Sequence, residues 1–327
     1  LTVIVAFTIT VILGVALIPF LKKLKYGQMI REDGPTWHKA KQGTPTMGGL
    51  MFIVGIVVAT IIGFSYLLMV DSSILSNTKE IIRLFAGLIM ALLFGMIGFI
   101  DDYIKVVKKQ NLGLRAKQKL ILQVLVTVLY LTVLYMFGDH STVVNIPFLG
   151  QWDFGLLYYP IMAILIIGIV NSVNLTDGVD GLATSVTFIV AIFFMVATST
   201  LKLFGLNVLS SAFAAALLGF LVYNIHPAKV FMGDTGSLFL GGMVIALAFG
   251  INMPFVVFFA GFMYCVESLS VILQVISYQT TRKRIFRMSP IHHHFEMGGM
   301  SENKIVIMFS LVTLIMCILA YFAVLSM

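Results

Sequence analysis

The sequence predicts an all-α integral membrane protein that crosses the bilayer about ten times. Hydrophobic residues make up 60% of its 327 residues and charged residues only 11%, a balance that excludes a soluble globular domain. Ten charge-poor runs are each about long enough to cross a hydrocarbon core of ~30 Å as a helix. In chain order these runs cover residues 1–21, 47–70, 84–100, 120–138, 154–176, 181–201, 203–225, 235–253, 254–278 and 305–327.

Two of these runs need separate justification. The first has no basic flank before it and no small-residue cleavage pattern after it, so we interpret it as a retained helix and not as a signal peptide. The ninth is interrupted by Glu267, a functional candidate by its location, although a protonated or interhelically bonded glutamate explains it equally well. The ten runs and their loops leave no room for a soluble domain, so we predict a single transmembrane domain over residues 1–327.

Positive charges predict the orientation of the helices. Ten crossings place both termini on the same side, and the loops then alternate between the two sides. Eighteen of the 21 lysine and arginine residues fall in one set of loops, namely 22–46, 101–119, 226–234 and 279–304. By the positive-inside rule this side is cytoplasmic, so both termini are expected to be extracytoplasmic. Attraction to anionic lipid headgroups also accounts for part of the net charge of +7.

The first polar site lies at the end of the third run, where Asp101 and Asp102 follow a stretch with two glycines. Adjacent carboxylates repel each other, which favours a bound cation or a shared proton. If the helix continues, Asp101, Lys105 and Lys109 share one face at spacings of four residues. An ordinary interfacial helix end with salt bridges accounts for the pattern equally well.

The second site is the segment 171–181, in which two amides precede two acids at a spacing of three residues. Asn171, Asn174, Asp177 and Asp180 form this series, and a glycine directly follows each acid. The glycines suggest a tight turn or broken helix whose backbone approaches a ligand closely. A simple connecting turn would need one Asp-Gly pair, so we favour a binding segment.

The third site is the segment 226–237. Pro227 should end the seventh helix, and Asp234 or Thr235 is well placed to cap the eighth. The free N–H groups of a helix start suit an anion such as phosphate, and a carboxylate there would hold Mg²⁺. Phe231 is either a stacking platform or a membrane-facing side chain.

The fourth site follows the ninth run, where a basic stretch over residues 282–287 precedes His292, His293 and His294. A membrane-surface segment explains the arginines but not three consecutive histidines. Zinc is disfavoured because no cysteine lies nearby and consecutive helical residues point in different directions. The segments 39–49 and 115–119 are weaker candidates, with cations and hydroxyl groups close to predicted helix starts.

These groups can converge on one cleft at the membrane surface, formed by loops 22–46, 101–119, 171–181, 224–237 and 279–304. Walker-type and G-x-G-x-x-G loops are absent from the sequence, which argues against P-loop and Rossmann enzymes. The chain resembles the phospho-N-acetylmuramoyl-pentapeptide transferase family, within the polyprenyl-phosphate N-acetylhexosamine-1-phosphate transferase superfamily. The resemblance rests on TPTMGG at 44–49, the acid pair at 101–102, NLTDGVDG at 174–181, FMGDTGS at 231–237 and SPIHHHFE at 289–296.

The resemblance implies a multi-pass enzyme of the bacterial plasma membrane with its active site facing the cytoplasm. Its two substrates would be UDP-N-acetylmuramoyl-pentapeptide and undecaprenyl phosphate, and its products UMP and lipid I, the first lipid-linked peptidoglycan precursor. The resemblance also implies Mg²⁺ as cofactor, contact with membrane lipid and a homodimer, with no nucleic-acid partner. The whole domain, residues 1–327, would then be catalytic.

Chemical roles can be assigned to the acids. Asp234 is our first choice for the Mg²⁺ ligand, and Asp101 for orienting the lipid phosphate or accepting a proton, with Asp102 supporting the site from its edge. The phosphate monoester of the lipid has a second pKa of ~6, so direct attack needs little activation. A double displacement with Asp101 or Asp234 as nucleophile stays open, although we prefer a single displacement.

The remaining roles come from the resemblance alone. Phe231 would stack on the uracil, and His292 would act in catalysis, with His293 and His294 beside it on the phosphate or sugar side. The nucleoside would be read by Asn171, Asn174, Asp177 and Asp180. The pyrophosphate and nucleoside region would be lined by Lys105, Lys109, Lys117 and Asn224.

Two alternatives remain at this point. A sister enzyme that uses UDP-N-acetylglucosamine shares the acid pair and the uridine site, and the segment around residues 292–296 argues against it. A secondary transporter would place ionisable groups near the bilayer midplane on broken helices, often with internal repeats. Here the acids cluster at helix ends and no repeat is evident, which favours the enzyme.

Overall fold

The computed structural model describes residues 1–23, 41, 43–108 and 112–326. Lys109 and most of the predicted loop 22–46 lie outside the described residues. Within the described part, nine helices are long and apolar enough to cross a membrane, and a bent pair forms a tenth candidate span. The nine are α1 (Thr2–Lys23), α2 (Gly49–Val70), α3 (Thr78–Val107), α4 (Ala116–Met136), α5 (Tyr158–Thr176), α6 (Leu182–Thr200), α7 (Phe204–Asn224), α8 (Gly233–Gly250) and α12 (Glu302–Leu325).

The tenth candidate span is sharply bent. The 3-10 helix η4 (Pro254–Val256) and α9 (Val257–Ala260) meet α10 (Phe262–Thr281) at an angle of 82°. The bend lies at Gly261, where an added Cβ would be 2.6 Å from the carbonyl oxygen of Val257. Glu267, which interrupts the apolar run in the sequence, lies inside the continuous helix α10.

Short elements complete the connections between the spans. A hairpin of β1 (Val143–Ile146) and β2 (Gly150–Asp153) pairs Val143 with Asp153 in the connection between α4 and α5. The remaining short helices are η2 (Ser72–Ser76), η3 (Gly155–Leu157) and α11 (Ile291–Glu296).

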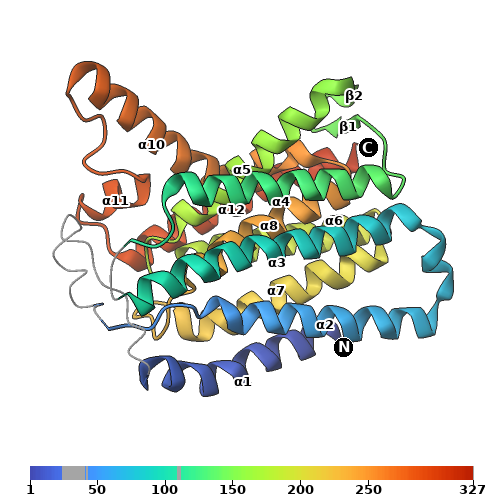
Figure 1. Cartoon of the computed structure of the whole chain (residues 1–327), viewed down its shortest axis with the longest axis horizontal. Coiled ribbons are helices and arrows are strands. Elements are labelled where there is room, and N and C mark those ends of the chain that lie inside the picture. Colours follow the sequence, from blue (N-terminus) through green and yellow to red (C-terminus); the bar gives the residue numbers. More distant parts are fainter. Residues whose placement is uncertain (24–40, 42, 109–111, 327) are drawn as a thin grey trace.

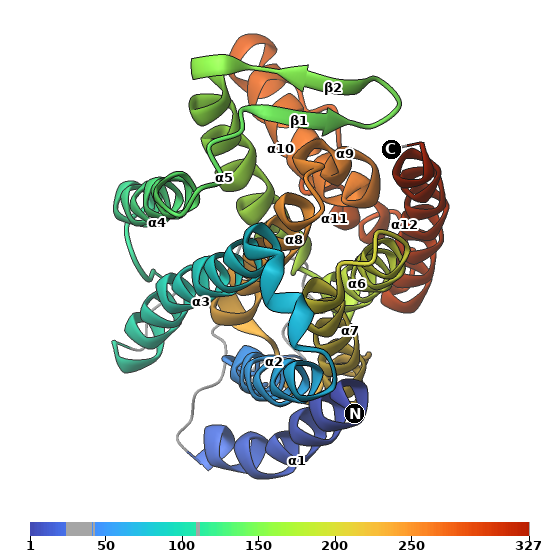
Figure 2. The ribbon, with the colours of Figure 1, turned by 90° about the vertical axis from the view of Figure 1, so that its right-hand side faces the viewer.

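Helix α8 is the central element of the bundle. Figure 2 views the molecule from one end and shows α8 surrounded by other helices. Every residue from Thr235 to Gly250 is buried, and α3 packs along α8 more extensively than any other pair of elements packs. Small residues permit this closeness, as is typical of helix pairs in membranes. An added Cβ at Gly242 would lie 2.7 Å from the Cα atom of Ala91 on α3.

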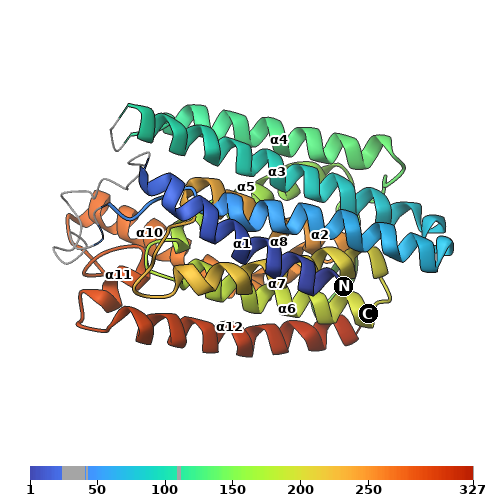
Figure 3. The ribbon, with the colours of Figure 1, turned by 90° about the horizontal axis from the view of Figure 1, so that it is seen from below.

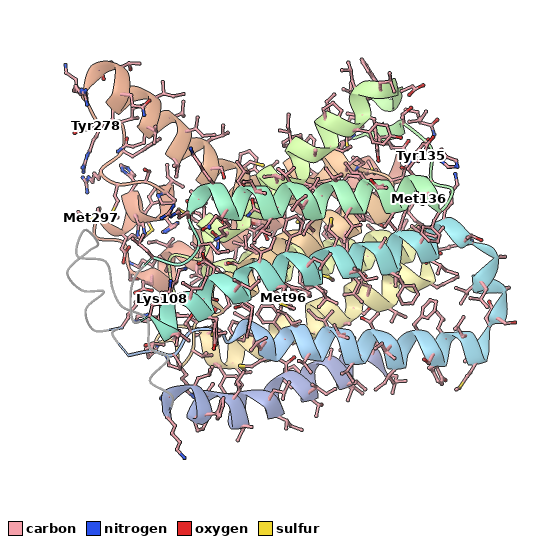
Figure 4. The ribbon with its side chains drawn as sticks, in the orientation of Figure 1. Met96, Lys108, Tyr135, Met136, Tyr278 and Met297 are labelled. Atoms are coloured by element: carbon pink, nitrogen blue, oxygen red, sulfur yellow. The ribbon has the colours of Figure 1, made fainter. Side chains whose placement is uncertain are left out.

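Polar motifs and chain termini lie at opposite ends of the bundle. Both termini point towards the same end in Figures 1 and 3. Figure 4 places Lys108, Tyr278 and Met297 at the other end, and Tyr135 and Met136 on the terminal side. The helix ends that carry the polar motifs therefore share one end of the molecule.

Two of the loops predicted to form the cleft, 101–119 and 171–181, are shorter than expected because helices extend into them. Helix α3 continues to Val107, so Asp101 and Asp102 lie on a helix and not in a loop. Helix α5 includes Asn171 and Asn174 and ends at Thr176. These extensions place acids and amides on rigid elements, with spacings fixed by the helical repeat.

Candidate active site

Three carboxylates from two helices form the centre of the site. Asp101 and Asp102 of α3 lie beside Asp234 of α8, and one oxygen from each lies within 4.8 Å of the others. Gly98 precedes the pair by one turn of α3. A Cβ at Gly98 would collide with the backbone of Asp234, so the glycine permits the close crossing that joins the three acids.

Asp102 caps the start of α8 from the neighbouring helix. Its carboxylate accepts hydrogen bonds from the N–H groups of Asp234 at 3.2 Å and Thr235 at 2.9 Å, and from the Thr235 hydroxyl at 2.7 Å. The prediction that Asp234 or Thr235 caps this helix is therefore wrong. Both oxygens of Asp102 serve the α8 N-terminus, where a carboxylate is stabilised by the free N–H groups and the helix dipole.

Asp234 is held by groups from three other helices. Its Oδ2 atom lies 2.9 Å from the Lys105 ammonium group of α3 and 3.0 Å from that of Lys119 at the start of α4. Its Oδ1 atom accepts a 2.8 Å hydrogen bond from the Asn174 amide of α5. Lys105 also forms an ion pair with Asp101, which confirms that these residues share one helix face.

Asp101 lies beneath the connection between α3 and α4. The N–H group of Leu114 donates a 2.8 Å hydrogen bond to its Oδ1 atom, and the residue is only 3% exposed. A Cβ at Gly113 would lie within 2.7 Å of three atoms of this carboxyl group. Gly113 and Leu114, directly before α4, therefore help to fix the Asp101 side chain in place.

The structure brings Lys119, and not Lys117, to the acids. Lys117 is exposed on the surface of α4. Two residues on a helix differ by about 200° around its axis, so the two lysines face different ways. Lys119, Gln123 and Thr127 follow each other at spacings of four, and Gln123 and Thr127 are buried. This polar stripe on an otherwise apolar helix was the signal in the sequence that would have identified Lys119.

Exchanging these two lysines for methionine should separate their roles. We expect Lys119→Met to lower the turnover of the enzyme at least about tenfold, corresponding to about 1.4 kcal/mol of transition-state stabilisation. Lys117→Met, the matched control on the same helix, should stay near the parental rate. The measurement is the initial rate at which the two purified variants release UMP, the product that the family resemblance implies. Equal losses of rate in both variants would contradict the assignment of Lys119 to the site.

The four polar residues of segment 171–181 do not share one environment. Asn174 contacts Asp234, whereas the Asn171 amide pairs with Gln123 of α4 at 2.8 Å. Asp177 is half-buried at the end of α5. Asp180 is buried and belongs to a second polar cluster.

The second cluster joins four distant segments around Asp180. The Lys41 ammonium group lies 2.7 Å from both Asp180 and Glu302, and the His226 ring lies 3.0 Å from Asp180. The N–H group of Ala228 also donates to Asp180, at 3.0 Å. Lys41 fell within a segment that the sequence marked as weak, and Glu302 was missed because its partners lie far away along the chain.

Asn224 and Phe231 lie at the two ends of the connection between α7 and α8 and form hydrogen bonds that hold it in place. Asn224 is buried, accepting from the Thr184 hydroxyl at 2.6 Å and donating to the Val230 carbonyl at 3.0 Å. The backbone of Phe231 bonds to Pro45 and Gly48 in the segment that leads into α2. The amide of Asn224 thus serves the loop conformation, and the half-buried ring of Phe231 is held by its backbone.

The three histidines have three different partners. The Nδ1 atom of His292 lies 2.9 Å from Glu267, and that of His293 lies 2.8 Å from Glu296. The Nδ1 atom of His294 accepts a 3.1 Å hydrogen bond from the backbone of Arg287. The three Nδ1 atoms have different partners because consecutive residues of a helix point in different directions.

Comparisons with known proteins identify the family of the chain. The model of Glycosyl transferase family 4 matches residues 84–252, and the Phospho-N-acetylmuramoyl-pentapeptide-transferase signature 1 matches residues 41–53. A phospho-N-acetylmuramoyl-pentapeptide-transferase of Caldicellulosiruptor bescii is 44% identical, covering 98% of this chain and 95% of the relative. Proteins of the same name from Clostridium botulinum and Halalkalibacterium halodurans are each 46% identical, with 97% and 98% of this chain and 94% and 96% of the relative covered.

The chain belongs to the phospho-N-acetylmuramoyl-pentapeptide-transferase family.

The family signature has a clear structural place in this transferase. Residues 41–53 include Lys41, which bonds Asp180, and the backbone groups that hold Phe231. They also include Gly49, which crosses α8 against Gly236, where an added Cβ would collide with the Gly236 backbone. The signature therefore ties α2 to the two loops beside the acids.

Carboxylate oxygens are suitable ligands for Mg²⁺, and the described residues contain two groups that could hold an ion. One is Asp101, Asp102 and Asp234, and the other is Asp180, His226 and Glu302. The first group fits Mg²⁺ better because its donors are all hard oxygen atoms. The partly exposed Lys105 and Lys119 side chains can move aside to make room for an ion. The Asp102 carboxylate, by contrast, already accepts hydrogen bonds from the start of α8.

Burial raises the pKa of Asp177 to about 8, and the negative charges of Asp234, Asp102 and Asp180 add to this effect. The folded protein therefore holds a proton on Asp177 at neutral pH, which an unfolded chain loses near its ordinary pKa of ~3.9. The stability associated with this proton is complete below about pH 4 and is lost as the pH rises towards 8.

Asp177→Asn should remove this pH dependence. We expect the variant to melt close to the parent at acidic pH and above the parent at pH near 9, because asparagine needs no proton in the buried site. Thermal unfolding of both proteins in detergent across this range tests the sign. A variant that loses stability relative to the parent as the pH rises would contradict the assignment.

Proposed function

We propose that this chain transfers phospho-N-acetylmuramoyl-pentapeptide from its UDP-linked form to undecaprenyl phosphate, releasing UMP and forming lipid I. The observation that carries the proposal is the placement of Asp234, which lies between two lysines and an amide beside the Asp101–Asp102 pair. Such a set of charges suits a reaction between phosphate groups, in which catalysis consists mainly of positioning and charge stabilisation.

The proposed step is a single displacement. An oxygen of the lipid phosphate forms a bond to the phosphorus attached to the sugar, and the bond from that phosphorus to the UMP oxygen breaks. Asp101 orients the incoming phosphate or accepts its remaining proton, and the half-buried Lys105 and Lys119 offset the charge of the departing UMP. A covalent intermediate on Asp101 or Asp234 is the alternative course.

Mg²⁺ would be held by Asp234, with Asp101 nearby, and would supply charge neutralisation at the pyrophosphate. Phe231 would stack on the uracil. Asn174 and Asp177, at the end of α5, would contact the nucleoside. By the same family argument we propose that the active site faces the cytoplasm of a bacterium, where nucleotide sugars occur, and that the enzyme is a homodimer.

Release of UMP tests the function. The purified protein would receive Mg²⁺ and undecaprenyl phosphate together with UDP-N-acetylmuramoyl-pentapeptide or UDP-N-acetylglucosamine. We expect release with the muramoyl peptide alone. Release only with UDP-N-acetylglucosamine would keep the reaction class and change the substrate, and no release with either from folded protein would reject the transferase proposal.

A further inference from the structure

Glu267 is a fully buried acid inside a membrane-spanning helix, and the proposed reaction gives it no role. It lies in α10 with 0% of its surface exposed. A carboxylate inside a membrane domain is costly, and such residues usually pair with one another or serve a function. Its Oε1 atom lies 2.9 Å from the Nδ1 atom of His292, which is itself fully buried.

The other ring nitrogen of His292 points at the connection between α5 and α6. Its Nε2 atom is buried and has no hydrogen-bond partner among the residues that the structure describes. The ring lies against Gly178, where an added Cβ would collide with Nε2 and lie 2.7 Å from Cε1. Gly178 is the glycine directly after Asp177, so Nε2 faces the segment that carries two of the acids.

Contacts on all sides therefore fix the His292 ring. Glu267 holds Nδ1, the backbone at Gly178 packs so closely against Nε2 that no Cβ would fit between them, and the centre of the His293 ring lies 4.1 Å from that of His292. Neither neighbouring histidine can take this place, because Glu296 and the Arg287 backbone bind them instead. Of the three histidines, His292 is the one that combines a carboxylate partner on α10 with a position against Gly178, in the acid-rich connection after α5.

We propose that Glu267 is a positioning residue that acts through His292 in the transfer reaction, an inference that rests on the proposed function. A carboxylate that accepts a hydrogen bond from Nδ1 fixes both the tautomer and the direction of an imidazole ring. Nε2 is then directed at the α5–α6 connection, where an oxygen of the phospho-sugar substrate gives it the partner it lacks. Gly178 has no side chain, which leaves the room that the His292 ring itself occupies against this connection.

Glu267→Gln is the main test. Glutamine keeps the size of the side chain, but its amide can either donate a hydrogen bond to Nδ1 or accept one from it, so it no longer selects one tautomer. We expect kcat to fall about 10- to 100-fold, as for other outer partners of an oriented histidine, with little change in KM for the nucleotide substrate. The double variant Glu267→Gln with His292→Asn should be no slower than His292→Asn alone, because both changes act through one ring. Effects that multiply would overturn the proposal.

Nitrogen-15 spectra of histidine-labelled protein provide a second readout that is independent of turnover. The His292 signal, identified by its loss in His292→Asn, should show a protonated Nδ1 in the parent and a changed tautomer distribution in Glu267→Gln. An unchanged distribution would reject the orienting role. If the parent released no UMP, the proposed function would be rejected. The nitrogen-15 spectra would still show whether Glu267 orients the His292 ring.

Tyr264→Phe is the matched control on the same helix. It removes a buried 2.8 Å hydrogen bond to Thr187 without touching His292. A merely structural role for Glu267 predicts that both variants lose thermal stability and leave the tautomer and kcat unchanged. The positioning role predicts that only Glu267→Gln changes them.

Discussion

Replacing Asp234 with asparagine is expected to lower UMP release by about 10³-fold or more, the effect of removing a central electrostatic group from a phosphoryl-transfer site. The substitution keeps the shape of the side chain and its contact with Asn174. It removes the charge that faces Lys105 and Lys119 at 2.9 and 3.0 Å, and with it the best Mg²⁺ ligand of the cluster. Lys105 retains Asp101 as a partner, so the fold should survive.

The measurement is the initial rate at several Mg²⁺ concentrations, and added Mg²⁺ should not restore the variant. Asp139→Asn is a suitable control because Asp139 is also a half-buried, ion-paired aspartate, 2.6 Å from Arg83 at the opposite end of the bundle. The control should lower thermal stability and leave kcat near the parental value. Parental turnover in Asp234→Asn would remove this residue from the mechanism.

The hydrophobic runs located the membrane helices well, because length and apolar content are local properties of the chain. They placed helix ends less well. The third run stops at the first charge, yet α3 continues to Val107 because the ion pair between Asp101 and Lys105 stabilises an extra stretch of helix. The bend at Gly261 was also hidden, since a glycine inside an apolar run is common in membrane helices.

The candidate site was predictable at the level of motifs and not of contacts. The density of acids and amides in the sequence identified four candidate residues that the fold brings together, namely Asp101, Asp102, Asn174 and Asp234. Which partner each residue meets depends on how helices face one another. Asp102 therefore caps a different helix, the Asp180 carboxylate pairs with Lys41, 139 residues away, and the Asp180 N–H donates to Glu302, 122 residues away. Spacing within one segment cannot contain such information.

Gly98→Ala is expected to inactivate the enzyme although no catalytic group changes. The added Cβ collides with the backbone of Asp234 and Thr235, where α3 and α8 cross without a side chain between them. All three atoms that it meets most closely belong to the start of α8, so the helices must separate there. Asp102 then loses its hydrogen bonds to α8, and Asp234 moves away from Lys105. We expect a rate loss of at least about 100-fold and a lower melting temperature, since misplacing reacting groups by ~1 Å costs this much.

Gly168→Ala separates this effect from the general consequence of replacing a helical glycine. Gly168 also lies inside a membrane helix, α5, but nothing lies within 4 Å of the position that its Cβ would take. Alanine has the higher helix propensity by about 1 kcal/mol, which favours both variants equally. Gly168→Ala should therefore match or exceed the parent in stability and rate. If Gly98→Ala did the same, α3 and α8 could separate without cost, and the close crossing would not be what holds the three acids together.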